Sequence, residues 1–232
     1  MKKILILLPT CLQLLSGTII GQTIGVRTLA LDESATEIER YVKTEKGHEL
    51  LVFLSRDPGF LVDAMVKDGV LPLYKKMIEP GEEPGEEPGF QAVQQLKLPN
   101  GAKSVLILGW SDDGNERYLV VDDNFSDARY NDWLMINAAS KTVGLQVGKN
   151  EKPFIINPNS IQICKVTTPE GKGAAVLGRA TLNGEPKTFY STYWPIRKGE
   201  RSIVIFFEQG ERVRVRKISD SILKKKSDGK AD

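Results

Sequence analysis

The sequence predicts an all-β protein made of two tandem immunoglobulin-like antiparallel β-sandwich modules that follow a cleaved signal peptide. Three observations predict this fold. Apolar residues alternate with polar ones, or form runs of about four to six bounded by Gly, Pro, Asn or Asp, which is typical of strands. Helical spacing is confined to Ser34–Tyr41, where Ser34-Ala35-Thr36-Glu37 resembles a capping box for one short turn. Finally, one strand-turn-strand pattern occurs twice.

Residues 1–22 are expected to form the signal peptide. Two lysines follow the first methionine, an apolar stretch comes next, and small or turn-prone residues lead to Gly21, the order typical of a secretory signal. A membrane span needs about 20 uninterrupted apolar residues, and Pro9 and Gln13 interrupt this stretch. The apolar run also continues beyond Cys11, which disfavours a lipid-modified cysteine there. We therefore expect export with cleavage near residue 22.

Charge and cysteine content bear on partners and compartment. The chain has 32 basic and 30 acidic residues, and cleavage removes Lys2 and Lys3 but no acid. The expected mature protein is neutral, so it has no long-range field that attracts nucleic acid or an anionic membrane. Cys164 becomes its only cysteine, so no internal disulfide can form. We interpret Cys164 as a small buried apolar residue.

The chain after the signal peptide divides into two modules of about 100 residues each. We expect module 1 over residues 23–123, a linker over 124–131, module 2 over 132–220 and a disordered basic tail over 221–232. Turn signals about every ten residues favour sandwiches. The expected strands are Ile24–Leu31, Leu50–Leu54, Phe60–Val66, Leu71–Met77, Gln91–Leu96, Val105–Trp110, Arg117–Val121, Trp133–Asn137, Thr142–Val147, Phe154–Ile156, Ile161–Val166, Ala174–Leu182, Lys187–Trp194, Ser202–Phe207 and Arg212–Ile218.

The repeated hairpin is the clearest sign of duplication. Each copy begins with a basic residue and a serine, continues as an apolar strand, turns at a glycine and ends in an acid. The two copies are Lys103–Asp123 and Arg201–Asp220. Gly114 and Gly210 supply the positive φ that such turns need. A looser match relates Glu49–Phe60 to Asp132–Val143.

Residues for common catalytic and metal chemistry are scarce. A Ser-His-Asp hydrolase needs an imidazole base, and His48, the single histidine, lies in the polar segment Thr44–Glu49. We interpret it as a solvated turn residue. Zinc sites need clustered His and Cys, which one of each does not supply. We expect no catalytic residue, no metal and no cofactor.

The acidic residues leave two further hypotheses open. Paired carboxylates are enough for glycan hydrolysis, although no pair stands out here. The segment Asp122–Asp132 suggests calcium, but its twelfth position is Trp133 rather than Glu and its sixth is not Gly. A calcium-binding hand is excluded, and a looser calcium site between the modules stays open. The duplicated Pro-Gly-Glu-Glu segment, residues 80–89, is interpreted as a solvated loop, with a cationic partner as the alternative.

The candidate ligand-binding residues are arginines and tryptophans. Arg212, Arg214 and Arg216 alternate with valines, so they share one face of a strand and form a basic stripe. The stripe is either a solvated or charged edge, or a site for an anionic ligand such as an acidic or cell-wall polysaccharide. A second set can stack on sugar rings, pack in a core or wedge between the modules. This set is Trp110, Trp133 and Trp194.

The leader, the paired modules, the repeated hairpin and the segment Phe189–Trp194 before a basic turn together resemble exported bacterial proteins of tandem β-sandwich type. That resemblance implies a fold and brings no activity. Size and two sandwiches are also similar to periplasmic pilus chaperones, which clamp a subunit strand with paired basic residues. This second resemblance implies a chaperone-like role.

We therefore expect an exported, non-catalytic protein of the periplasm, envelope or cell surface that binds another macromolecule, either a protein or a polysaccharide. The first alternative is a glycan hydrolase or lyase with paired carboxylates. The second is a two-domain periplasmic chaperone-like protein. Neither nucleic acid binding nor a membrane span in the mature chain is expected.

Overall fold

The computed structural model describes residues 22–77, 89–112, 114–123, 132–149, 151–166, 173–182, 185–196 and 200–221. Within them it contains sixteen strands and one short 3-10 helix, η1 (Ser34–Glu37), so the expected all-β fold is confirmed. Residues 1–21, most of the Pro-Gly-Glu-Glu segment, the expected linker and the tail after residue 221 lie outside the described residues. Gln22, the last residue of the expected signal peptide, begins the first strand.

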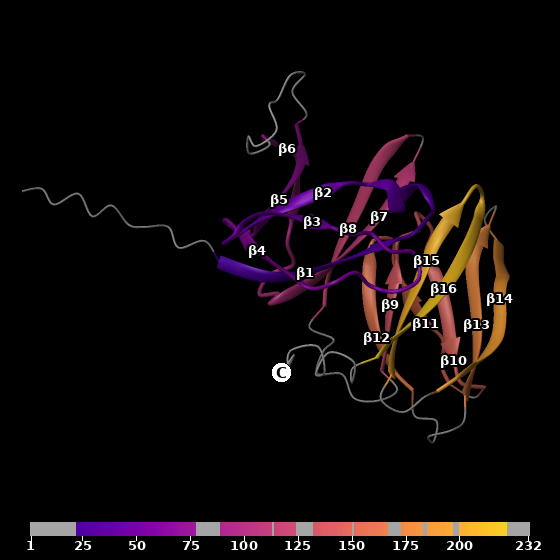
Figure 1. The fold of residues 1–232 in the computed structure, drawn as a ribbon. Helices are drawn as coiled ribbons and strands as arrows, with labels where there is room; N and C mark the ends of the chain where they lie inside the picture. Colours follow the sequence, from indigo (N-terminus) through magenta and orange to yellow (C-terminus); the bar gives the residue numbers. More distant parts are fainter. Residues whose placement is uncertain are drawn as a thin grey trace, which may run out of the picture.

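Module 1 is a sandwich of two four-stranded sheets (Figure 1). We call the sheet that faces module 2 the inner sheet, and its strand order is β4-β1-β7-β8. The other is the outer sheet, with the order β3-β2-β5-β6. The strands are β1 (Gln22–Ala30), β2 (Arg40–Thr44), β3 (Gly47–Leu51), β4 (Val62–Val66), β5 (Val70–Lys76), β6 (Phe90–Lys97), β7 (Ser104–Asp112) and β8 (Asn115–Asp122).

Module 2 repeats this plan. Its inner sheet has the order β12-β9-β15-β16 and its outer sheet the order β11-β10-β13-β14. The strands are β9 (Asp132–Asn137), β10 (Val143–Val147), β11 (Phe154–Ile156), β12 (Ser160–Lys165), β13 (Gly173–Leu182), β14 (Glu185–Pro195), β15 (Glu200–Gln209) and β16 (Arg212–Ser221). Each strand of module 2 occupies the place of the strand eight positions earlier in the chain, and both inner sheets contain one parallel pair, β1–β7 and β9–β15.

The strand pairing corrects the alignment of the two copies. Leu106 pairs with Val121 and Ile203 pairs with Ile218, and all four side chains face the opposite module. In the structural alignment of the two hairpin copies, Ser104 therefore corresponds to Arg201. The sequence pattern had aligned Ser104 with Ser202, so the two alignments differ by one residue. The looser match was wrong, because β9 (Asp132–Asn137) is the counterpart of β1 rather than of Glu49–Phe60.

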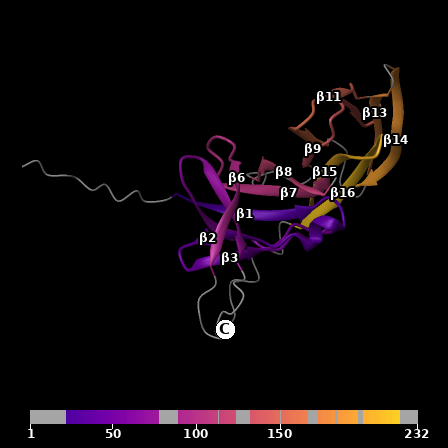
Figure 2. The same ribbon diagram turned by 90° about the horizontal axis from the view of Figure 1, so that it is seen from above.

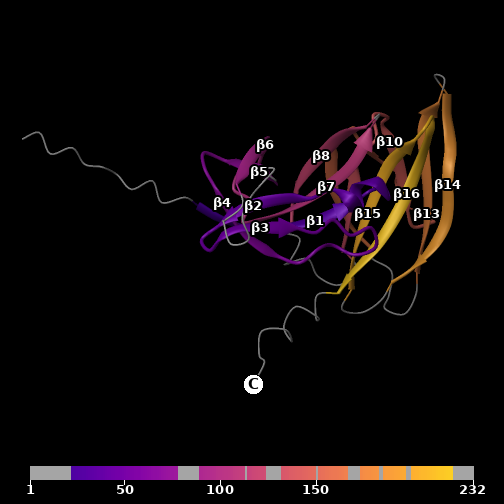
Figure 3. The same cartoon turned by 45° about the horizontal axis from the view of Figure 1, so that its top comes forward.

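Three apolar cores lie between four sheets. One fills module 1 and another fills module 2. The third joins the inner sheets across the module boundary. It contains Leu29, Leu106, Leu108 and Val121 of module 1 with Ile136, Ile203, Ile205 and Ile218 of module 2, among others. Figures 1, 2 and 3 show β15 and β16 running past the ends of β1 and β7. The modules are thus docked face to face rather than joined by the chain alone.

Four buried charges reinforce this docking. The Arg27 side chain donates to Asp123 at 2.7 Å and to Asp220 of module 2 at 3.1 Å. Arg201 donates to Asp220 and lies 3.5 Å from an Asp123 oxygen. Each acid therefore meets arginines of both modules, which compensates the cost of burying charge. We call these four side chains the ion cluster.

The hairpin β2–β3 differs from expectation. The one short helical turn expected at Ser34–Glu37 is present as η1, whereas β2, which pairs with β3, was not among the expected strands. His48 lies in β3 and stacks on Phe90 with ring centroids 4.0 Å apart, so it is not a solvated turn residue. Burial and the charge of Lys43 lower its pKa. The β-branched and aromatic residues of β2 (Arg40–Thr44) favour a strand there.

Candidate ligand cleft between the modules

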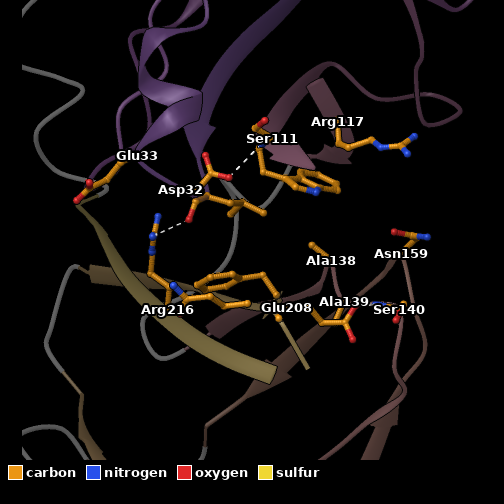
Figure 4. A pocket seen from close by; sticks show the side chains of 15 residues that line it. Asp32, Glu33, Ser111, Arg117, Ala138, Ala139, Ser140, Asn159, Glu208 and Arg216 are labelled. Carbon is orange, nitrogen blue, oxygen red and sulfur yellow. Dashed lines mark hydrogen bonds between the residues drawn. The ribbon is translucent and has the colours of Figure 1, made fainter. Parts of the chain in front are cut away.

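A cleft of about 1120 Å³ opens where the core between the modules ends. Both modules line it, and Figure 4 shows side chains from both converging on it. Module 1 contributes Leu31, Asp32, Glu33, Trp110, Ser111 and Arg117, and module 2 contributes Ala138, Ala139, Ser140, Asn159, Phe207, Glu208, Gln209, Gly210 and Arg216.

In module 1 the cleft wall is held together by Asp32, which follows β1. The amide of Leu31 first donates to the carbonyl of Gly109 at 2.8 Å, so the chain stays beside β7. One carboxylate oxygen of Asp32 then accepts from the Ser111 amide at 3.0 Å, and the other accepts from the Ala35 amide at 2.8 Å. Asp32 is therefore fixed by backbone donors (Figure 4).

In module 2 the wall is built the same way with the acid on the other strand. The amide of Ala138, after β9, donates to the carbonyl of Phe206 at 2.8 Å. Glu208 of β15 accepts from the Ser140 amide at 2.9 Å and lies 3.1 Å from the Lys141 ammonium. Burial acts to raise the pKa of Glu208. The hydrogen bonds from Ser140 and Lys141, together with the charge of Lys141, outweigh burial and lower the pKa.

The register of the two copies shows that the walls are counterparts. Counting from Leu106 and Ile203, Trp110 of β7 corresponds to Phe207 of β15. Each aromatic residue pairs across its hairpin with an arginine, Trp110 with Arg117 and Phe207 with Arg214. Both aromatic residues are partly buried and pack against the core between the modules.

Arg216 crosses from one module to the other at the cleft. Its guanidinium donates to the carbonyls of Ala30 and Leu31 at 2.7 Å and of Ser55 at 3.2 Å, and it lies 5.4 Å from the ring centre of Phe207. Burial lowers the pKa of Arg216, and the charge of Asp32 opposes that shift. These contacts make Arg216 a docking residue.

The three arginines of the expected basic stripe have different surroundings in the structure. Arg212, Arg214 and Arg216 alternate along β16 on the face that carries Ile218, toward module 1. Arg212 and Arg214 are exposed, whereas Arg216 is occupied by the carbonyls of module 1. Of the three arginines, Arg216 lines the cleft.

The three candidate tryptophans also lie in two different places. Trp110 lines the cleft between the modules. Trp133 and Trp194 are only 2% and 7% exposed and pack on each other inside module 2, with ring centroids 5.2 Å apart. The Trp194 indole donates to the Tyr190 hydroxyl at 2.9 Å. Neither can stack on a sugar or wedge between modules, because β9 points Trp133 into the core of its own sandwich.

The calcium hypothesis loses one of its expected ligands. Asp123 is buried and its carboxylate is held by Arg27. Residues 124–131 lie outside the described part of the chain. Among the residues that the structure places, no group of three or more His, Cys, Asp or Glu side chains is arranged to hold a metal. Cys164 is half-buried in the edge strand β12 and packs against the core of module 2.

Sequence reasoning missed Asp32, Phe207 and Glu208. Only a correctly aligned repeat would have found Phe207, as the counterpart of Trp110.

No protein-family model matches the chain, and no curated protein matches it. None of the helical segments described is long and apolar enough to cross a membrane.

Proposed function

We propose that this chain is an exported, non-catalytic binding protein that holds a segment of a glycan chain in the cleft between its modules. The observation that carries this proposal is the composition of the cleft, in which Trp110 and Phe207 come from opposite modules. The leader pattern of residues 1–22 supports export.

The cleft suits a sugar because it combines ring faces with hydrogen-bonding groups. The apolar face of a pyranose stacks on an aromatic side chain, and its hydroxyls need polar partners. Ser111, Ser140, Asn159 and Gln209 line the cleft beside the aromatic residues. Ligand sites of this kind have apolar walls and a few placed polar groups.

Two of the three acids that line the cleft, Asp32 and Glu208, favour binding over hydrolysis. A glycosidase needs one carboxylic acid whose pKa is raised, so that it can protonate the leaving oxygen. Glu208 has a lowered pKa, and both oxygens of Asp32 already accept backbone hydrogen bonds. These two carboxylates therefore act as supports for the cleft walls.

A polysaccharide binding panel with product analysis tests the proposal. We expect the purified protein to retain at least one polysaccharide by isothermal titration calorimetry, with no new reducing ends or unsaturated products. Trp110→Leu should weaken binding about tenfold, because it keeps the packing but removes a stacking face. Phe60→Ala is the matched control, since Phe60 is 80% exposed and lies outside the cleft lining.

Retention of an exported protein instead of any glycan would point to the chaperone-like alternative. Chain cleavage by the protein would point to the hydrolase or lyase. Either result contradicts the proposal.

A further inference from the structure

Most of the charges that line the cleft are bound within the protein, and this bears on the kind of glycan that it takes. Both oxygens of the Asp32 carboxylate accept backbone amides. Glu208 is held by Ser140 and Lys141. The Arg216 guanidinium donates to three carbonyls of module 1. A charged ligand would have to displace these partners, which fix the cleft walls.

The other charged residues of the lining also give an ionic ligand little. Arg117 takes part in an interaction within the protein. Glu33 is exposed, and water and salt screen an exposed charge so that it contributes little to binding. Among the described residues, three acids and two arginines line the cleft, so an acidic glycan meets more negative than positive charge.

Uncharged polar side chains complete the lining. Ser111 comes from β7, Asn159 from the turn before β12 and Gln209 from the end of β15. Asn159 has a φ of 53°, in the left-handed region that asparagine tolerates. Hydroxyl and amide side chains donate and accept hydrogen bonds, which is what the hydroxyls of a neutral sugar require. Both modules thus provide groups for an uncharged ligand.

The aromatic rings act in the same direction. Trp110 and Phe207 are partly buried at the margin of the core between the modules. A ring face in such apolar surroundings binds the apolar face of a pyranose, but it gives no hydrogen bond to a carboxylate, whose removal from water is costly. The cleft volume of about 1120 Å³ exceeds the roughly 300–1,000 Å³ of pockets for single small ligands. The cleft therefore has room for several sugar residues.

We infer that the cleft selects an uncharged glycan, several sugar residues long, over acidic and cationic chains. The rings of Trp110 and Phe207 stack on sugar faces. The side chains of Ser111, Asn159 and Gln209 form hydrogen bonds with sugar hydroxyls. This inference rests on the proposed function and names its ligand class.

Calorimetry with soluble polysaccharides sorted by charge tests the inference on the whole protein. The neutral members are galactomannan and mixed-linkage β-glucan, the acidic members are polygalacturonate and alginate, and the cationic member is chitosan. We expect a neutral polysaccharide to bind at least about tenfold more tightly than any charged one. Its affinity should change by less than about twofold between low and high salt, because no ion pair is formed.

Chemical neutralisation gives matched pairs of ligands. Polygalacturonate is compared with the same polymer after its carboxyl groups are reduced to alcohols, and short glucosamine oligomers are compared with their N-acetylated forms. We expect neither neutralisation to weaken binding. Loss of affinity after reduction or acetylation would show that the charge is recognised, and would overturn the inference.

Competition separates the cleft from the exposed Arg212 and Arg214, which lie on β16 and are not among the lining residues. An anionic ligand that binds at these arginines leaves the cleft accessible. We therefore expect a short oligogalacturonate to leave the bound neutral glycan in place. Its displacement by the acidic oligomer would overturn the inference.

Variants place the neutral glycan in the cleft. Phe207→Leu should weaken its binding about tenfold, as Trp110→Leu should, because each change removes one stacking face. Gln209→Ala should weaken binding about fivefold through lost hydrogen bonds. Gln162→Ala is the matched control, since Gln162 is an exposed glutamine of β12 that is not among the lining residues. Circular dichroism shows that each variant keeps the fold, and equal losses in the two glutamine variants would contradict the assignment.

The outcomes separate this inference from the proposed function. Tighter binding of an acidic or cationic glycan than of every neutral one overturns the inference and leaves glycan binding in place. Failure of every polysaccharide to bind overturns both.

Discussion

At the scale of single residues, the ion cluster holds four charges away from water. Asp220 is contacted by Arg27 and Arg201, and the side chains of these three residues are at most 9% exposed. Removing one partner of a buried pair leaves an uncompensated charge away from water. The cluster therefore depends on both acids.

Asp220→Asn should lower the free energy of unfolding at neutral pH by about 3 kcal/mol, because two buried arginines lose a carboxylate. Urea unfolding followed by tryptophan fluorescence measures the change. Asp63→Asn, an exposed acid in β4, is the control and should have little effect. Equal stability of the two variants would contradict a docking role for the cluster.

The same residue predicts a pH dependence. Burial acts to raise the pKa of Asp220, but the charges of Arg27 and Arg201 and their hydrogen bonds outweigh it, so the folded pKa lies below the ordinary value of 3.8. The stabilisation is therefore complete above that value and is lost as the pH falls through the lower folded pKa. The stability gap between the wild type and Asp220→Asn should be constant at neutral pH and narrow below about pH 4. A gap that stays constant under acid would refute this.

At the scale of elements, alternation in the sequence was a sufficient guide to most strands, because it records which side of a sheet each residue faces. The two glycines also predicted both hairpin turns correctly, since Gly114 and Gly210 have positive φ values of 78° and 61°. Alternation failed for β2, which follows directly after a turn of helix, and for Trp133, whose direction depends on the register of β9. Periodicity shows that a strand has two faces but does not show which neighbour covers each face.

Glycines in or beside these hairpins predict two different costs. At Gly210 an added Cβ meets nothing within 4 Å, so Gly210→Ala should cost about 1 kcal/mol from its positive φ alone. At Gly109 the added Cβ would lie 2.8 Å from the ring of Phe53, so Gly109→Ala should cost about 2 kcal/mol from overpacking. Thermal unfolding measures both. Gly109→Ala combined with Phe53→Leu should recover part of its loss, whereas Gly210→Ala should gain nothing from the same change.

At the scale of the whole molecule, the cleft exists because the modules are docked. Its site could not be predicted from the sequence, since contacts such as Arg27–Asp220 join residues 193 positions apart. The stripe of arginines was predicted correctly as one face of a strand. Its division into docking and exposed residues follows only from the position of module 1.

Arg216→Ala should loosen the docking, because three carbonyls of module 1 lose their charged donor. We expect a loss of about 2 kcal/mol in stability and a larger radius of gyration by small-angle X-ray scattering. Arg214→Ala, an exposed arginine of the same strand, is the control and should leave the radius unchanged. An unaltered radius in Arg216→Ala would show that the core and the ion cluster dock the modules without it.

The core between the modules has a consequence for the symmetry of the molecule. Leu29, Leu106, Leu108 and Val121 meet Ile136, Ile203, Ile205 and Ile218, which are their own counterparts in the second copy. A surface that meets its own equivalent is the hallmark of an isologous homodimer. The protein thus has the form of an isologous dimer whose two halves are joined in one polypeptide.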